Sequence, residues 1–243
     1  MTRRLEDNGA VSSNNNGEVR HINRIFDMVN KLKQDNRVIV TFTDFSYLEA
    51  FYVSYTVSRL WRFPNFFVVA LDKRTYDVLE SQNFPVALIK TNEANSLKQT
   101  TDRSDYGGHS FNQIMRMKLI IIRYILNMNV GVLIFDSDVV IFKDPFSGLP
   151  ENDEFDIIAQ KDEHICAGFI YWRPTPASRR LVTMAMRRME GREIHDQEAI
   201  LEIVENKLLP ELESRLFHPP IYNRGNIFFE KHQFCWIPIG RYS

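Results

Sequence analysis

The chain has few cysteines, no long apolar run and no excess of either charge, and each absence excludes a class of protein. Its two cysteines, Cys166 and Cys235, allow one disulfide, but two buried thiols are the simpler interpretation, and no zinc-site spacing is present. No apolar run reaches about 18 residues, so we expect no membrane-spanning segment. Thirty Lys and Arg against 31 Asp and Glu argue against a nucleic-acid-binding protein, which would show a basic excess.

What is present is the composition of an ordinary globular protein. The 243 residues are 44% hydrophobic and 25% charged, enough for one sizeable core. Residues 1–20 are polar and lack the apolar centre of a signal peptide, so we expect a disordered tail there. Residues 21–243 are predicted to form a single domain.

Short apolar runs alternate with helical patterns along most of the chain. This alternation predicts an α/β fold with parallel strands and right-handed crossovers. Ser46 is the expected cap of the second helix, and residues 91–109 are expected to form a long loop. Strands are predicted at 37–42, 66–71, 86–90, 155–160 and 168–172 besides one that begins at 132, and helices at 22–32, 46–60, 73–81, 110–127, 176–189 and 195–207, with an irregular stretch in the last 30 residues.

An acidic pair interrupts the most apolar stretch of the sequence. Asp136 and Asp138 lie one residue apart, between the aliphatic runs 132–135 and 139–142. Such a run predicts a strand buried on both faces, from whose end the carboxylates emerge. Strand alternation would place both on one side, with Ser137 opposite. Two carboxylates near an apolar interior require compensation, and a divalent cation is a fitting one. Capped or salt-bridged structural carboxylates are the alternative.

Further segments accompany this pair in a fixed order. They are Arg116-Met117-Lys118, the DxD stretch from Gly131 to Phe146, Gly168-Phe-Ile-Tyr-Trp-Arg-Pro-Thr175 and His195-Asp196-Gln197-Glu198-Ala199. Together they resemble the Nucleotid_trans family of nucleotide-diphospho-sugar transferases over about residues 37–235. The resemblance implies a GT-A-like single domain, an α/β fold with a mostly parallel central sheet flanked by helices and a Rossmann-like nucleotide-binding half.

The resemblance also implies a donor and a cofactor. Asp138 would bind Mn²⁺ or Mg²⁺, and Asp136 would bind the metal or the ribose hydroxyls, with Ser137 beside them. The nucleotide would be held at the end of the first strand, by Thr41, Phe42 and Thr43. A UDP-sugar is the implied donor.

Other family features imply the remaining site residues. Lys118 or Arg116 would supply positive charge toward the phosphates; two residues apart, they cannot share a helix face, and Lys118 is favoured. Gly168 would let the backbone approach a ligand closely. Asp196 and Gln197 would orient the donor or stabilise positive charge at the anomeric carbon, and a capping carboxylate is the alternative for Asp196.

The implied activity is that of a retaining hexosyl- or pentosyltransferase acting on a glycan or protein acceptor. Such enzymes usually lie in the Golgi lumen behind a membrane anchor, which this sequence does not show, so its location is open. The family's third metal ligand, a C-terminal His after an aliphatic-Pro stretch, is not found after Ile237-Pro238-Ile239, and Cys166-Ala167-Gly168 replaces the usual Asn-Thr-Gly. A non-catalytic nucleotide-sugar-binding homologue is therefore an alternative.

A second alternative is a haloacid-dehalogenase-like Mg²⁺-dependent phosphatase. The pattern Asp136-x-Asp138-x-Val140 also matches the first motif of that class, in which the first Asp is the nucleophile. Three predicted strands precede the acidic one, however, and no late acidic pair follows an aliphatic strand. Both features argue against it.

Overall fold

The computed structural model describes residues 25–89, 109–147, 149, 155–161, 164–217 and 237–238. The predictions for the tail, for loop residues 91–108 and for Cys235 lie outside these ranges. Residues 25–32 are helical. The strands are β1 (Arg37–Thr43), β2 (Phe66–Ala70), β3 (Val86–Leu88), β4 (Gly131–Phe135), β5 (Val139–Val140), β6 (Ile157–Lys161), β7 (Ile165–Trp172), β8 (Ser214–Leu216) and β9 (Ile237–Pro238). The helices are η1 (Phe45–Tyr47), α2 (Leu48–Ser58), η2 (Leu60–Arg62), α3 (Lys73–Ser81), α4 (His109–Asn127), α5 (Pro176–Met189) and α6 (Asp196–Glu205).

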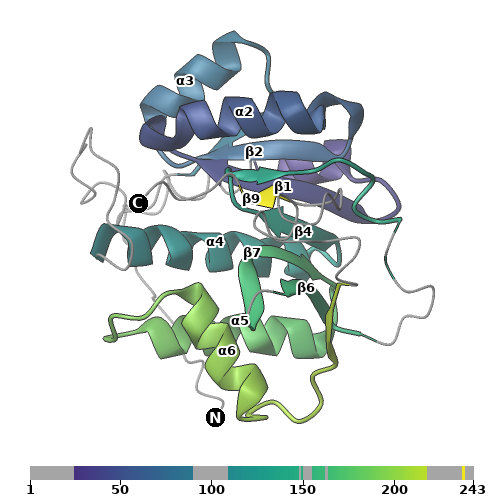
Figure 1. Cartoon of the computed structure of the whole chain (residues 1–243), viewed down its shortest axis with the longest axis vertical. Helices are drawn as coiled ribbons and strands as arrows, with labels where there is room; N and C mark the ends of the chain where they lie inside the picture. Colours follow the sequence, from purple (N-terminus) through teal and green to yellow (C-terminus); the bar gives the residue numbers. More distant parts are fainter. Residues whose placement is uncertain are drawn as a thin grey trace, which may run out of the picture.

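A seven-stranded sheet in the order β3-β2-β1-β4-β7-β6-β8 runs through the centre of the molecule (Figure 1). β1 pairs in parallel with β2 and β4, and β2 with β3, which confirms the predicted parallel pairing of the first four strands. β7 instead runs antiparallel to both β4 and β6. β8 pairs in parallel with β6, although the last 30 residues were expected to be irregular. The α/β class, with a mostly parallel sheet flanked by helices, is confirmed.

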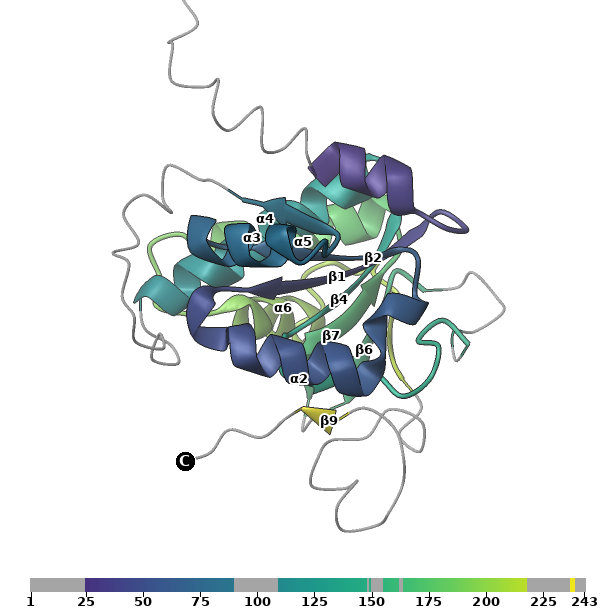
Figure 2. The same ribbon diagram turned by 90° about the horizontal axis from the view of Figure 1, so that it is seen from above.

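Helices cover both faces of the sheet, α2 on one face and α4 and α5 on the other (Figure 2). Alternate residues of one strand therefore enter two separate cores. Val132 and Ile134 of β4 pack with the α4–α5 side, whereas Leu133 and Phe135 pack with the α2 side. Burial of both faces explains why these strands are continuous apolar runs rather than alternating ones.

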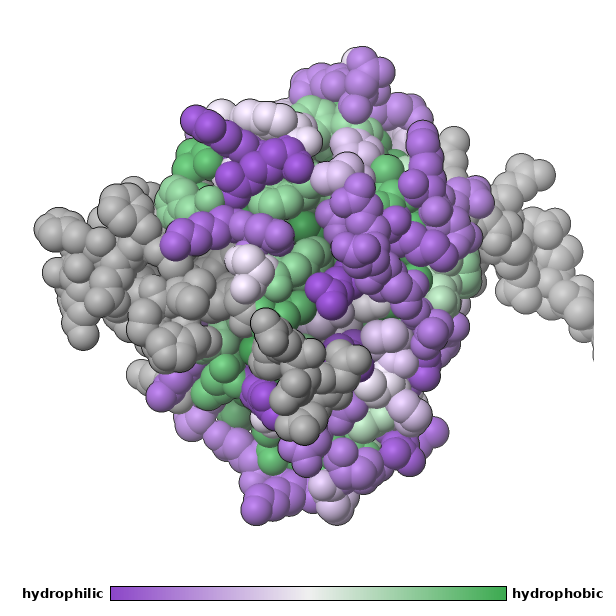
Figure 3. Space-filling view, turned by 90° about the vertical axis from the view of Figure 1, so that its right-hand side faces the viewer, coloured by the Kyte–Doolittle hydropathy of each residue, from purple (hydrophilic) through white to green (hydrophobic). Residues whose placement is uncertain are grey.

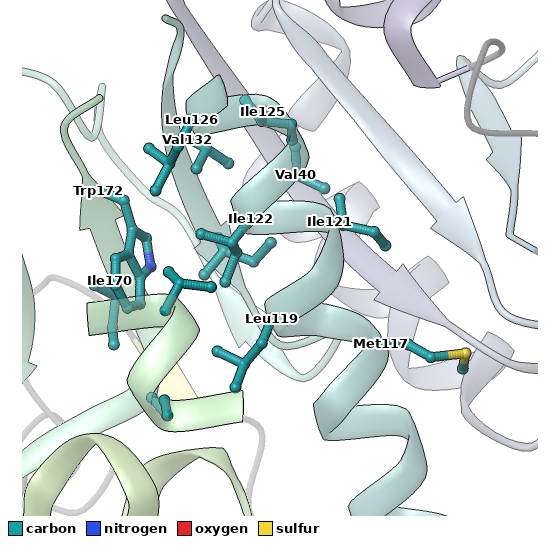
Figure 4. Packing of buried hydrophobic residues seen from close by; sticks show 14 of the residues in the cluster. Val40, Met117, Leu119, Ile121, Ile122, Ile125, Leu126, Val132, Ile170 and Trp172 are labelled. Atoms are coloured by element: carbon teal, nitrogen blue, oxygen red, sulfur yellow. The ribbon is translucent and has the colours of Figure 1, made fainter. Parts of the chain in front are cut away.

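Helix α4 is held against the sheet by large apolar side chains. Leu119 and Ile122 lie on the side of the helix that faces Ile170 and Trp172 of β7 (Figure 4). Trp172 is among the largest fully buried side chains. Burial of each such side chain contributes about 1.5–3 kcal/mol. The polar residue on the buried face of α4, Lys118, is therefore fixed in position by its neighbours.

The start of the second helix differs from the prediction. Asp44, not Ser46, is the cap: its Oδ1 accepts a hydrogen bond from Tyr47 N at 3.0 Å. That bond closes the short helix η1, and α2 begins only at Leu48. Asp and Ser are comparable caps, so composition alone does not distinguish them.

The surface is mixed in character. On the face drawn in Figure 3, hydrophobic residues lie interspersed among hydrophilic ones. In the described part of the chain, no helix is both long and apolar enough to cross a lipid bilayer.

Candidate active site

Four segments bring polar groups together where β4 ends. Lys118 lies on α4, Asp136 follows β4 directly, Ala167 belongs to β7 and Asp196 opens α6. Lys118 Nζ donates hydrogen bonds to Asp136 Oδ1 at 3.0 Å and to Ala167 O at 2.8 Å. It also forms an ion pair with Asp196 Oδ2 at 3.1 Å, without the angles of a hydrogen bond. One ammonium group thus joins three elements.

This ammonium group is almost completely buried, with 2% of the Lys118 side chain exposed. Burial alone would lower the pKa of Lys118, but the charges of Asp136 and Asp196, with the hydrogen bond to Asp136, raise it above its ordinary value. Lys118 is therefore protonated at neutral pH. With both carboxylates ionised, one positive charge faces two negative charges, so the cluster is one charge short of neutrality.

The acidic pair lies in a turn, not in an extended strand. Asp136 N donates to Gly168 O at 3.0 Å, and Val139 N donates back to Asp136 O at 3.1 Å, which closes the turn. The segment is therefore not the extended strand that the predicted alternation assumed. Ser137 is buried, whereas the side chain of Asp136 is 43% exposed and Asp138 is partly buried. The turn, rather than strand periodicity, sets how the two carboxylates are presented.

Gly168 gives the Asp136 carboxylate room beside β7. A Cβ atom at position 168 would lie 2.8 Å from Asp136 Oδ2, closer than side-chain carbons approach other atoms. The sequence predicted a close approach by a ligand, and in the structure the close neighbour is this carboxylate. The contact with a ligand stays a prediction.

The first residues of α6 contact the same stretch of β7. Asp196 is 4% exposed in its side chain, and Gln197 Oε1 accepts a hydrogen bond from Ala167 N at 3.1 Å. The helix start is fixed further by Glu198 Oε2, which accepts from His195 N at 3.2 Å. Both polar backbone groups of Ala167 are thus bound by site side chains, the carbonyl by Lys118 and the amide by Gln197.

The residues expected to hold the nucleotide lie at the carboxyl end of β1. Thr41 is paired in register with Phe135 and donates its hydroxyl to Phe135 O at 2.8 Å. Phe42 is buried in the core, and Thr43 Oγ1 donates to Asp44 O at 3.2 Å. All three lie at the same edge of the sheet as Asp136. Their predicted contact with uracil and ribose stays a prediction.

The other cation considered, Arg116, is directed elsewhere. Arg116 Nη2 forms an ion pair with Glu190 Oε1 at 3.1 Å, and both side chains are partly exposed. Lys118, two residues later on α4, is the one that reaches Asp136. The expectation that the two cations occupy different helix faces agrees with this geometry.

The remaining candidate ligands do not add to the cluster. Asp144 Oδ1 accepts from Phe146 N at 2.9 Å, so Asp144-Pro145 forms the predicted turn. Over the ranges that the structure describes, no group of three or more His, Cys, Asp or Glu side chains is placed to hold a metal ion. His218 and His232 lie outside those ranges.

Two serines that the sequence reasoning did not single out support the acidic turn. Ser54 Oγ donates to Val139 O, and Ser58 Oγ accepts from Ile141 N at 2.7 Å. Both serines lie on the buried face of α2 and are almost fully buried. Two polar residues four positions apart on an otherwise apolar helix face are a signal that sequence inspection could have used.

Comparison with known proteins gives a family match in sequence and a likeness in fold. The model of the family described as nucleotide-diphospho-sugar transferase matches residues 62–227. Among solved structures, the apo structure of the bifunctional glycosyltransferase WbbM is similar with a TM-score of 0.54 and 13% identity, covering 86% of this chain and 47% of that one. This likeness is one of fold.

Two curated relatives are similar in sequence. Arabinosyltransferase XEG113 of Arabidopsis thaliana is 24% identical over 208 residues, which cover 76% of this chain and 31% of the relative. UDP-galactose:fucoside alpha-3-galactosyltransferase of Dictyostelium discoideum is 23% identical over 182 residues, which cover 63% of this chain and 28% of the relative. The chain thus spans less than a third of the length of these relatives.

Proposed function

Because the chain belongs to the nucleotide-diphospho-sugar transferase family and has its GT-A-like fold, we propose that it is a retaining glycosyltransferase that uses a UDP-sugar donor. The names of the two relatives, an arabinosyltransferase and a UDP-galactose-dependent galactosyltransferase, support a pentosyl or hexosyl donor linked to UDP. The acceptor is a glycan or a protein. Retention of configuration rests on the family resemblance.

The observation that carries this proposal is the position of Asp136. Its carboxylate is held by the buried Lys118 ammonium at 3.0 Å, yet it is 43% exposed at the carboxyl end of a central strand. Ligands of open α/β sheets bind at this edge. A carboxylate that is fixed on one side and exposed on the other is suited to bind a cation together with its ligand.

The residues fit a Mn²⁺ or Mg²⁺ ion that is shared with the donor. Asp136 and Asp138 supply two carboxylates, and Mg²⁺ in proteins usually takes one or two carboxylates, completing its shell with water and phosphate oxygens. The absence of a third candidate ligand in the described residues is compatible with that mode. When bound, the cation would offset the negative charge of the departing nucleoside diphosphate.

The other residues of the cluster would orient Asp136 and the donor sugar, and would stabilise charge that develops during transfer. Lys118 is engaged by two carboxylates and a carbonyl, so we assign it the role of orienting Asp136 rather than of binding phosphate. Asp196 places a buried negative charge at the start of α6, where it would stabilise positive charge developing at the anomeric carbon. Gln197, held through Ala167 N, would orient the donor sugar with its amide group.

Release of UDP from nucleotide sugars tests the proposal. UDP-galactose, UDP-arabinose, UDP-xylose and UDP-glucose would be incubated with the protein and Mn²⁺, with and without EDTA. We expect slow UDP release from at least one donor, abolished by EDTA and by Asp138→Asn. The matched control Asp77→Asn, on the exposed surface of α3, should be unaffected.

Other outcomes would favour the alternatives. Binding of UDP and Mn²⁺ without release from any donor would favour a non-catalytic homologue. Release of phosphate from phosphomonoesters would favour the phosphatase, against which the family membership argues. The anomeric configuration of a product, read by NMR, would test retention.

A further inference from the structure

A cavity of about 640 Å³ opens at the edge of the sheet opposite the candidate active site. Its lining includes Arg37 at the start of β1, whereas the candidate active site lies beyond the end of that strand. Seven residues of strand separate the two edges by about 20 Å. The cavity is therefore separate from the site of Asp136, and its volume is in the range of small-ligand pockets.

The most informative residue of this cavity is Arg37. Its guanidinium lies over two aromatic rings, 5.4 Å from the centroid of Phe146 and 5.9 Å from that of Tyr171. Within the described ranges its side chain has no hydrogen-bond or ion-pair partner. These ring contacts use no oxygen or nitrogen acceptor, so they leave the N–H donors of the guanidinium available to a ligand. Arg37 is thus a positioned cation without an oxyanion among the described residues.

The backbone that carries Arg37 is fixed as well. Gln34 and Arg37 exchange both backbone hydrogen bonds, at 3.1 and 2.8 Å, around a tight turn. The two residues between them, Asp35 and Asn36, have φ values of 45° and 58°, the left-handed pair of a type I′ turn. Asn65 Nδ2 donates to Arg37 O at 3.2 Å and ties the turn to the neighbouring strand. Binding of a ligand to the guanidinium would therefore cost little conformational entropy in the backbone.

The charge of the lining limits the class of ligand. Arg37 and Arg62 are balanced by Asp35 and Asp144, so the cavity carries no net charge, which disfavours a polyanion. Asn65 and the two carboxylates offer partners for hydroxyl groups. The combination suits a ligand with a single carboxylate and several hydroxyls.

We infer that this cavity binds an acidic sugar, a uronic acid residue of a glycan. Its carboxylate would pair with the Arg37 guanidinium in the bidentate geometry that favours Arg over Lys. Its hydroxyls would bind the amide of Asn65 and the carboxylate of Asp144 or Asp35. The inference does not depend on the proposed transferase activity, because the two sites lie at opposite edges of the sheet.

Titration with D-glucuronate tests it. We expect glucuronate to bind the full chain at least ten times more tightly than either glucose, which lacks the carboxylate, or acetate, which lacks the hydroxyls. Arg37→Gln and Arg37→Lys should each weaken glucuronate binding at least tenfold. Arg116→Gln, which removes a partly exposed arginine on α4, should leave it unchanged, and none of the three should alter binding of UDP with Mn²⁺.

Four results would overturn the inference. Two are equal affinity for glucuronate and glucose, and equal affinity for glucuronate and acetate. The third is unchanged glucuronate affinity in the Arg37 variants, and the fourth is absence of glucuronate binding. If Arg37→Gln does not fold, the glucuronate affinity of Arg37→Lys is the test of the inference. Lysine keeps the charge and the aliphatic stem but not the planar pair of donors.

Discussion

Gly168 and Asp136 constrain each other, because a methyl group on Gly168 would lie 2.8 Å from Asp136 Oδ2. The same carboxylate is held by Lys118 through its other oxygen. A change at position 168 must therefore move the carboxylate or the strand. This relationship leads to the first prediction.

Gly168→Ala should weaken binding of Mn²⁺ together with UDP by about 10- to 100-fold, the range found when groups that orient metal ligands are changed. Isothermal titration calorimetry would measure it. Gly131→Ala is a matched control, because its Cβ would lie 2.5 Å from Tyr171 Oη. Gly131 begins β4, so this contact is at the end of the strand away from Asp136. The control should lose stability but not metal affinity, and equal losses of affinity would show that strain, not Asp136, is responsible.

Lys118→Met should lower the free energy of unfolding by about 3–5 kcal/mol, because it leaves the buried Asp196 carboxylate without its counter-ion. Urea denaturation would measure the change. Arg116→Met, which removes a partly exposed ion pair, should cost no more than about 1 kcal/mol. Adding Asp196→Asn to Lys118→Met should recover part of the lost unfolding free energy. A double variant that is less stable than Lys118→Met alone would contradict this account.

The stability that Lys118 contributes should depend on pH in the alkaline range. An unfolded lysine has a pKa of about 10.4, and the pKa of Lys118 in the folded protein is higher. The contribution is therefore fully present below the unfolded pKa and is lost as pH rises toward the folded one, by about 1.4 kcal/mol per pH unit. The difference in unfolding free energy between the parent and Lys118→Met, followed from about pH 7 to about pH 11, should be flat and then fall. A difference that grows with pH would contradict a raised pKa of Lys118 in the folded protein.

Ser58→Ala should cost about 1–3 kcal/mol, because it leaves the buried backbone N–H of Ile141 without an acceptor. We also expect weaker Mn²⁺ binding, since Ile141 follows the acidic turn by only a few residues. Ser81→Ala, whose hydroxyl donates to Val78 O on the exposed side of α3, is the control and should change stability by less than about 0.5 kcal/mol. Thermal or urea unfolding would distinguish the two.

The elements that the sequence predicts well are those determined by local pattern. Helix α5 has the predicted bounds, 176–189, because Thr175 accepts from Ser178 N at the start and Pro176 suits the first turn. The strand before Asp136 was equally clear, since four apolar residues in a row leave no exposed face. The emergence of Asp136 at the strand's end follows from the same pattern.

What the sequence did not predict depends on partners far along the chain. The turn at Asp136 is set by Gly168 O, and a pattern read locally cannot include that acceptor. The resemblance directed Lys118 toward phosphates, but the structure provides two carboxylates as its counter-ions. The direction of β7 follows from its short connection to β6, residues 162–164, because antiparallel neighbours can be joined by a few residues whereas parallel ones need a long crossover.

The contacts of Lys118 also bear on how the protein is made. The lysine is synthesised before each of its partners, and the last of them, Asp196, belongs to a helix that emerges much later. Until α6 has packed against α4, the ammonium group lacks one of its two counter-ions, so the charge cluster cannot be completed on a nascent chain that stops short of that helix. The cluster therefore depends on a contact between segments that lie far apart in the sequence.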